Sequence, residues 1–223
     1  VAHFQPKHLA GRRVLVTAGP TFEPLDPVRG LTNRSSGKMG FAIAQAAQEA
    51  GAAVTLVAGP VALATPRGVR RVDVTTAVDM DQAVSALQDE ADVFVATAAV
   101  ADWRAAQVSE EKIKKSPAAT APSLSFVENP DILARVAASD RARSGALFCV
   151  GFAAESHDLL AHAQAKRLRK GVPLLVGNLG PATFGQDDNR LLLIDDHSVT
   201  ELPLASKLAL ARQLVARIAQ SLT

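Results

Sequence analysis

The segment MGFAIAQAAQEAGAAVTLVA (residues 39–58) joins a helical pattern to a strand pattern. Its first part belongs to an Ala-rich run at 38–50, and its second, at 53–58, is apolar and β-branched. Other runs of the second kind, typical of strands buried on both faces, occur at 13–18, 92–98, 146–153 and 173–178, and a short strand is expected at 69–74. Other helical patterns lie between them, at 79–90, 129–139 and 155–170. This alternation predicts an α/β domain with a doubly wound, mostly parallel sheet.

The C-terminal part of the sequence predicts antiparallel additions. The runs RLLLID (190–195) and SVTELP (198–203) flank a short polar turn and predict a hairpin. An amphipathic pattern at 204–222 predicts a final helix. Residues 1–12 have no regular pattern, so we expect a linker remnant there and a domain spanning 13–223. The expected fold class is therefore a Rossmann-like α/β sheet with a C-terminal antiparallel hairpin.

Composition narrows the classes of function. The 223 residues carry a net charge of only +2, whereas a nucleic-acid-binding protein is expected to have a basic excess. No apolar run approaches the ~20 residues that a membrane-spanning helix needs. The single cysteine, Cys149, cannot form an internal disulfide, which favours a cytoplasmic location. It lies in an apolar run, and this predicts a buried structural thiol rather than a nucleophile.

Two long connections, at 19–37 and 103–125, interrupt the compact pattern. Each follows the carboxyl end of a strand, where open α/β sheets bind their ligands. Because long loops in compact domains are often binding loops or lids, we expect a ligand site and an active-site lid here. The second connection contains EEKIKK (110–115), which is either part of a lid or a solvated run of charges.

The first connection ends in TNRSSGKMG (32–40), directly before the predicted helix. The first turn of a helix leaves backbone N–H groups unpaired, and such groups bind phosphate. The residues expected to bind phosphate or substrate there are Ser35, Ser36, Gly37, Lys38 and Gly40. The two serines can equally cap the helix.

Two established nucleotide-binding patterns do not fit. The dinucleotide fingerprint is absent, because a long insert separates Gly19 from Gly37 and the second strand ends without a carboxylate. The P-loop pattern is absent because Met39 follows Lys38. An NAD(P)-dependent oxidoreductase and a nucleotide-binding module without catalysis remain as alternatives. The histidines lack metal-ligand spacing, so the sequence does not identify protein ligands for a metal.

Two lysines of the helix predicted at 155–170 suggest a polyanion. Lys166 and Lys170 are four residues apart and share a helix face, where like charges destabilise the helix. A bound polyanion would offset that repulsion. Cations near a helix C-terminus also complement the helix dipole, and the spacing does not separate these two explanations.

Six segments occur in the order and spacing of a known family: TAGPTFEPLDPVRGLTNRSSGKMGFAIA (17–44), AAVADWR (98–104), EEKIKK (110–115), ENPDIL (128–133), GFAAE (151–155) and AKRLRK (165–170). Together they closely resemble the phosphopantothenoylcysteine synthetase domain of bacterial bifunctional coenzyme A biosynthesis proteins. The resemblance covers the chain from about residue 10 onward. It implies a cytoplasmic phosphopantothenate–cysteine ligase that joins 4′-phosphopantothenate to L-cysteine through an acyl-cytidylate and releases pyrophosphate and CMP.

The resemblance also implies specific residues and partners. It assigns catalysis to Asn33 and Lys112, with Lys112 on the lid. The implied CTP contacts are Ala96, Thr97, Ala98, Asp102, Lys112, Pro130, Asp131, Ile132, Leu133, Phe152, Lys166 and Lys170. It further implies Mg²⁺ carried with CTP, a homodimer, and an FMN-dependent decarboxylase domain before Val1 in the native protein.

Overall fold

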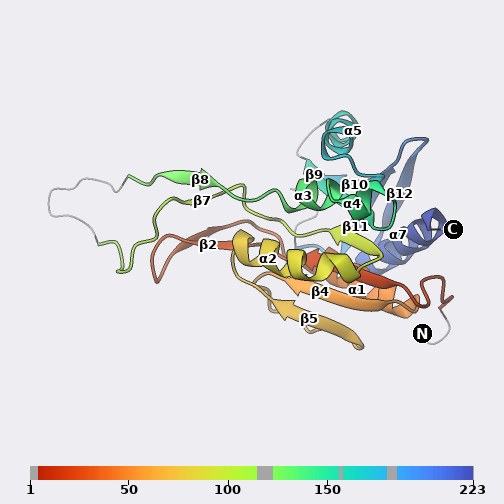
Figure 1. Ribbon diagram of the computed structural model, residues 1–223, viewed down its shortest axis with the longest axis horizontal. Coiled ribbons are helices and arrows are strands. Elements are labelled where there is room, and N and C mark those ends of the chain that lie inside the picture. Colours follow the sequence, from red (N-terminus) through yellow and green to blue (C-terminus); the bar gives the residue numbers. More distant parts are fainter. Residues whose placement is uncertain (1–4, 115–122, 156–157, 180–184, 223) are drawn as a thin grey trace.

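A computed structural model describes residues 5–114, 123–155, 158–179 and 185–222. Its centre is a sheet with the strand order β12-β11-β10-β9-β6-β1-β4-β5 (Figure 1). The parallel strands are β1 (Arg13–Ala18), β4 (Ala53–Ala58), β5 (Val69–Asp73), β6 (Val93–Ala96), β9 (Phe148–Glu155) and β10 (Leu174–Leu179). The antiparallel hairpin consists of β11 (Asp188–Ile194) and β12 (Val199–Ser206). The predicted fold class is confirmed.

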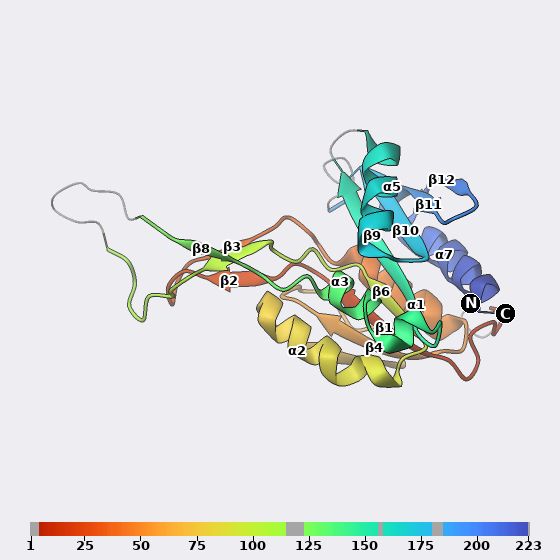
Figure 2. The same cartoon turned by 45° about the horizontal axis from the view of Figure 1, so that its top comes forward.

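Helices cover both faces of the sheet (Figure 2). One face packs against α1 (Lys38–Glu49) and α7 (Lys207–Ser221). The other face packs against α2 (Ala77–Leu87), α3 (Ile132–Ala137), α4 (Asp140–Arg143) and α5 (Leu159–Lys170). A 3-10 turn, η2 (Gln88–Glu90), follows α2. These two layers create a separate apolar core on each face of the sheet.

Strand β1 shows why its sequence is apolar at nearly every position. Val14 and Val16 point into the core beneath α1 and α7, whereas Leu15 points into the opposite core. Cys149 of β9 lies in this second core with only 1% of its surface exposed, and burial raises its pKa to about 12. The prediction of a buried structural thiol is confirmed.

The bounds of several predicted elements differ from the structure, most clearly those of three helices. The helix expected at 129–139 is divided into α3 and α4, because Asp131 and Ser139 each accept a backbone N–H and cap a new helix. Strand β9 continues to Glu155 through its pairing with β10, so α5 begins only at Leu159. The last helix begins at Lys207 because the residues before it extend β12 and Ser206 caps the helix.

The two long connections form an arm that projects beyond the sheet (Figures 1 and 2). In the first connection, β2 (Phe22–Pro24) pairs with β3 (Gly30–Thr32). In the second, β7 (Trp103–Ala105) pairs with β8 (Phe126–Glu128), and part of the expected lid, residues 115–122, lies outside the described residues. The sequence did not predict these strands, since three residues are too few for an alternating pattern.

Residues 7–12, in the segment expected to be a linker remnant, contact the end of α1. Leu9 is buried, and its N–H donates to the Ala50 carbonyl over 2.9 Å. The Lys7 amine donates to the Glu49 carbonyl over 2.6 Å. The burial of Leu9 and these two hydrogen bonds therefore hold the segment before β1 against the end of α1.

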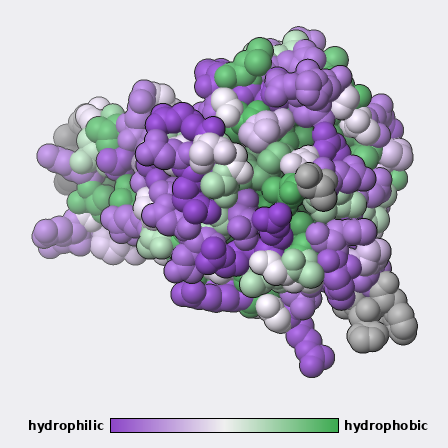
Figure 3. All heavy atoms as spheres, turned by 45° about the vertical axis from the view of Figure 1, so that its right-hand side comes forward, coloured by the Kyte–Doolittle hydropathy of each residue, from purple (hydrophilic) through white to green (hydrophobic). Residues whose placement is uncertain are grey.

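Hydrophilic residues predominate on the face of the molecule drawn in Figure 3. None of the described helices is long and apolar enough to cross a membrane.

Candidate functional site

A cleft with a volume of about 590 Å³ lies at the carboxyl ends of β1, β6 and β9. Its walls come from the start of α1, the loop after β6, the start of α3 and the last turns of α5. These segments are far apart in the sequence, and the parallel sheet brings them together at the carboxyl ends of its strands. This edge is the place where open α/β sheets bind ligands, as the sequence predicted.

Most of the predicted site residues meet in this cleft. The expected phosphate-binding residues lining it are Ser35, Ser36, Gly37, Lys38 and Gly40. The expected CTP contacts lining it are Ala96, Thr97, Ala98, Asp102, Pro130, Asp131, Ile132, Leu133, Phe152, Lys166 and Lys170. Asn33 and Lys112 do not belong to the lining.

The loop before α1 has the geometry of an anion site. Gly37 adopts a left-handed conformation (φ 75°) and begins the helix without a side-chain cap. The Gly37 N–H donates to the Ser35 hydroxyl over 3.4 Å, a weak bond, so this serine organises the loop rather than the first helical turn. Gly40 permits close packing, because a Cβ there would lie 2.5 Å from the Ala18 Cβ. The first amides of α1 therefore face the cleft close to the end of β1.

Side chains beneath the cleft hold the loop after β6 in place. The Ala98 N–H donates to the Thr17 hydroxyl and the Ala101 N–H to the Thr21 hydroxyl, over 3.3 and 3.0 Å. The Asn129 amide donates to the Ala101 carbonyl over 2.8 Å. These three polar residues were not predicted, although each follows or ends a strand near the predicted site.

Asn33 joins this loop to the phosphate loop. Its amide donates to the Ala99 carbonyl, while its side-chain oxygen accepts the Ser35 N–H over 2.9 Å. Asn33 thus fixes the position of both loops from below. A side-chain amide carries two N–H groups, and the bond to the Ala99 carbonyl uses one of them.

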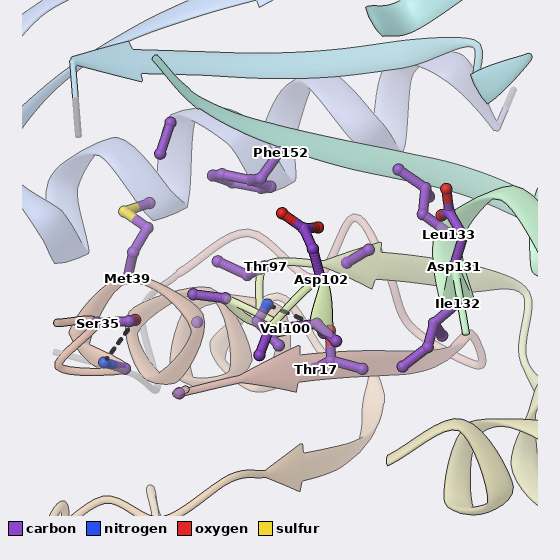
Figure 4. Close-up of a pocket in the computed structure, with 18 of the residues that line it drawn as sticks. Thr17, Ser35, Met39, Thr97, Val100, Asp102, Asp131, Ile132, Leu133 and Phe152 are labelled. Atoms are coloured by element: carbon purple, nitrogen blue, oxygen red, sulfur yellow. Dashed lines mark hydrogen bonds between the residues drawn. The ribbon is translucent and has the colours of Figure 1, made fainter. Parts of the chain in front are cut away.

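The Asp102 carboxylate points into the space beneath the Phe152 ring (Figure 4). Asp131 and the apolar side chains of Ile132 and Leu133 lie across the cleft from Met39. This combination of an aromatic face, aliphatic walls and a few polar groups is typical of a small-molecule site.

An ion pair closes the α3–α5 side of the cleft. The Lys170 amine contacts the Asp131 carboxylate, which also caps α3 by accepting the Ala134 N–H over 3.0 Å. Partial burial acts to raise the pKa of Asp131, but the bonds from Lys170 and Ala134 outweigh it and lower that pKa. Lys166 contributes a second positive charge to the same carboxylate. Both lysines of α5 thus lie where the sequence predicted an anion contact.

Lys112 lies on the arm with its side chain exposed. The neighbouring Ile113 is fastened at both ends, since its N–H donates to Asp26 over 3.1 Å and its carbonyl accepts from Arg29 over 2.6 Å. The bond from Arg29 is the largest cause of the lowered pKa of Asp26. The lysine segment is thus anchored to the turn between β2 and β3, away from the described lining of the cleft.

Three further polar residues line the cleft on its α1–α7 side: Asn178, Asn189 and Lys207. Asn178 occurs near the carboxyl end of a predicted strand, a position that could have identified it. Lys207 belongs to an amphipathic helical pattern, and nothing in that pattern indicates that this lysine lines a cleft. Among the residues that the structure describes, no group of three or more His, Cys, Asp or Glu side chains could hold a metal ion.

A parallel α/β sheet with an anion loop and lysines at its carboxyl edge defines a phosphate- or nucleotide-binding class of protein. Sequence comparison makes this class specific. The chain belongs to the family described as the DNA/pantothenate metabolism flavoprotein C-terminal domain, which matches residues 9–222.

Relatives of known identity agree with this family. The chain is 49% identical over 218 residues to the coenzyme A biosynthesis bifunctional protein CoaBC of Vibrio cholerae, covering 95% of this chain and 54% of that protein. It is 47% identical over 226 residues to CoaBC of Escherichia coli strain K12, covering 98% and 54%. The chain therefore spans about half the length of the curated relatives that it matches. A crystal structure of the C-terminal domain of CoaBC matches with a TM-score of 0.82 and 36% identity, covering 97% of this chain and 98% of that one.

Proposed function

We propose that this domain is a CTP-dependent phosphopantothenate–cysteine ligase of coenzyme A biosynthesis. The observation that carries the proposal is the single cleft in which the phosphate loop, the loop after β6, the start of α3 and the α5 lysines converge. Its relatives named coenzyme A biosynthesis bifunctional protein support the pathway. The chemistry of a triphosphate and a phosphorylated acid explains why such a cleft needs cations and N–H groups.

The proposed reaction has two steps. A carboxylate oxygen of 4′-phosphopantothenate attacks the α-phosphorus of CTP, and the bond to the β-phosphate breaks to release pyrophosphate. The amine of L-cysteine then attacks the acyl carbon, loses a proton and displaces CMP, which leaves an amide. Negative charge moves onto the leaving pyrophosphate in the first step and onto the acyl oxygen in the second.

The residues of the cleft can support these steps. The amides from Ser35 to Gly40 bind phosphate oxygens, and Lys166 and Lys170 add positive charge from α5. The Asp102 carboxylate points into the space beneath the Phe152 ring and would accept a hydrogen bond from a hydroxyl group of the nucleotide. The described residues fit a Mg²⁺ ion held mainly by phosphate oxygens, because Mg²⁺ in such sites needs few protein ligands and the cleft has no carboxylate cluster among them. Bound Mg²⁺ would neutralise part of the triphosphate charge.

We also infer a homodimer that forms through the arm. Among the described residues, exposed large apolar side chains concentrate there: Val28, Trp103, Val108, Leu124, Phe126 and Val127. Exposed apolar side chains gathered on one part of a surface mark interaction sites. A cytoplasmic location would fit a reaction that consumes CTP.

The two alternatives receive less support. A dinucleotide-dependent oxidoreductase needs a carboxylate at the end of β4 to bind the ribose. In this chain Gly59 and Pro60 follow that strand instead. A binding module without catalysis would have no need for Lys112 on a fastened segment.

With CTP, 4′-phosphopantothenate, L-cysteine and Mg²⁺, we expect pyrophosphate release that depends on the first two substrates. Replacing CTP by ATP should lower the rate about 10²-fold, because a mismatched base leaves buried polar groups unpaired. A coupled pyrophosphate assay measures both rates. Equal rates with ATP would contradict CTP specificity, and no release with either nucleotide would contradict the ligase.

Replacing Lys166 or Lys170 by Ala should raise the KM for CTP about tenfold, equivalent to ~1.4 kcal/mol, with little loss of folding. The matched control is Arg169→Ala, which removes an exposed cation from the same last turn but lies outside the cleft lining. Steady-state kinetics and thermal unfolding separate the two roles. An equal fall in Tm for all three variants with unchanged KM would instead support the helix dipole as the only role.

A further inference from the structure

A buried carboxylate in the arm joins the turn between β2 and β3 to the segment that carries Lys112. The Asp26 side chain is 0% exposed, although the arm projects beyond the sheet. Its Oδ1 accepts the backbone N–H groups of Val28 and Arg29, each over 2.8 Å. Its Oδ2 accepts the Ile113 N–H over 3.1 Å and two N–H groups of the Arg29 guanidinium over 3.0 and 2.6 Å. One oxygen therefore shapes the turn, and the other holds the lysine segment and the guanidinium.

The backbone is held on both sides of Lys112. After it, both the N–H and the carbonyl of Ile113 are bonded to the turn. Before it, the Ser109 N–H donates to the Leu25 carbonyl over 3.0 Å, and the Ser109 hydroxyl donates to the Glu111 carbonyl over 2.6 Å. The Lys112 side chain is exposed. The segment thus presents an exposed lysine from a backbone of fixed position.

We infer that Asp26 is a positioning residue that holds Lys112 in place for the first step of the reaction. This inference rests on the proposed function. Fixing the backbone beside a catalytic cation lowers the conformational entropy that is lost when the transition state forms, and it keeps the cation in a productive position. Since Asp26 bonds to the turn and to the lysine segment, the two move as one unit.

Asp26→Asn separates the two contacts of the carboxylate. Asparagine has one acceptor oxygen, which can hold the turn or the lysine segment but not both. Exchange of the Ile113 N–H with deuterium, measured by NMR, should become about tenfold to a hundredfold faster, because a hydrogen bond to a charged group is lost. Acyl-cytidylate formation in single turnovers without cysteine should slow by a similar factor, while the Kd for CTP changes much less.

A double-mutant cycle shows whether Asp26 acts through Lys112. When Lys112 is already replaced by Gln, adding Asp26→Asn should slow the first step by less than about twofold, because the group that Asp26 positions is absent. The matched control is Asp195→Asn. Asp195 also accepts two backbone N–H groups of its turn and an N–H of Arg217, but it lies between β11 and β12 and outside the cleft lining. That variant should lower Tm and leave the first step and the exchange of Ile113 unchanged.

Three results would overturn the positioning role: unchanged exchange at Ile113 in Asp26→Asn, an unchanged first-step rate, or an equal loss of rate with and without Lys112. If circular dichroism shows that Asp26→Asn is unfolded, Asp26→Ser decides the question by the same measurements, because its shorter hydroxyl can still accept a turn N–H. A protein that forms no acyl-cytidylate would contradict the ligase. The exchange rate of Ile113 would still decide whether Asp26 holds the Lys112 segment.

Discussion

Replacement of Lys112 by Gln should abolish most pyrophosphate release, with a loss of about 10²–10³-fold in the rate of the first step. Negative charge develops around the α-phosphate only while the acyl-cytidylate forms, and a cation that stabilises it acts on this step alone. Rapid quenching of reactions without cysteine, followed by mass spectrometry of the acyl-cytidylate, measures the rate directly. CTP affinity should change much less than this rate.

The matched control for this variant is Lys114→Gln, which removes the same charge two residues away on the same exposed segment. It should form the intermediate nearly as fast as the unaltered protein. Formation of acyl-cytidylate at the normal rate by Lys112→Gln would refute the catalytic assignment. Equal losses in the two variants would mean that the segment contributes only a diffuse positive field.

Asn33→Asp should have its main effect on the second step, so that acyl-cytidylate accumulates while amide formation slows about 10²–10³-fold. The substitution removes an amide donor and puts a carboxylate where negative charge grows on the acyl oxygen. The new carboxylate would also repel the Ala99 carbonyl oxygen, which accepts a hydrogen bond from the Asn33 amide in the structure. Mass spectrometry of quenched reactions with and without cysteine distinguishes the two steps.

The structure also suggests a second role for Asn33, in which it positions the phosphate loop and takes no part in catalysis. Its side-chain oxygen accepts the Ser35 N–H, and aspartate would retain this acceptor. Asn33→Ala removes both contacts and should therefore disturb the phosphate loop and CTP binding as well. If Asn33→Asp forms no intermediate and binds CTP as weakly as Asn33→Ala, the residue only positions the loop.

Mixing the two variants tests how Lys112 reaches the cleft. If the arm delivers Lys112 to the partner's site in a homodimer, random exchange of subunits between Lys112→Gln and Asn33→Asp should restore roughly a quarter of the activity, because half the dimers then contain one intact site. If Lys112 acts within its own chain, mixing should restore none. A monomer by light scattering would contradict the proposed dimer.

The sequence predicted the sheet well because its information is local. The apolar runs at 13–18 and 53–58 became β1 and β4 with the same boundaries, since both faces of each strand are buried. The run at 92–98 became a shorter strand, β6, because the sheet pairing ends at Ala96 and side-chain hydrogen bonds hold the residues after it. The predicted helix bounds were wrong where a capping serine or aspartate divided one helical pattern into two helices.

Most residues of the cleft were predicted through motifs, but how segments pack against one another could not be predicted in this way. Lys112 and Asn33 occur in recognisable segments, but their distance from the cleft lining depends on how the arm and the loops pack. Lys207 and Asn189 come from the C-terminal hairpin and helix, more than 130 residues along the chain from the phosphate loop by sequence number. No local pattern connects residues at such separations.

The sequence by itself determined the alternation of strands and helices, the anion loop before α1 and the family, because periodic burial and short motifs are properties of neighbouring residues. Only the tertiary structure decided that Asp131 pairs with Lys170, that Asp26 and Arg29 fasten the lysine segment, and that Lys207 lies buried at the cleft. The physical reason is that charge pairing and burial depend on distances between segments, and the pairing order of the sheet sets those distances.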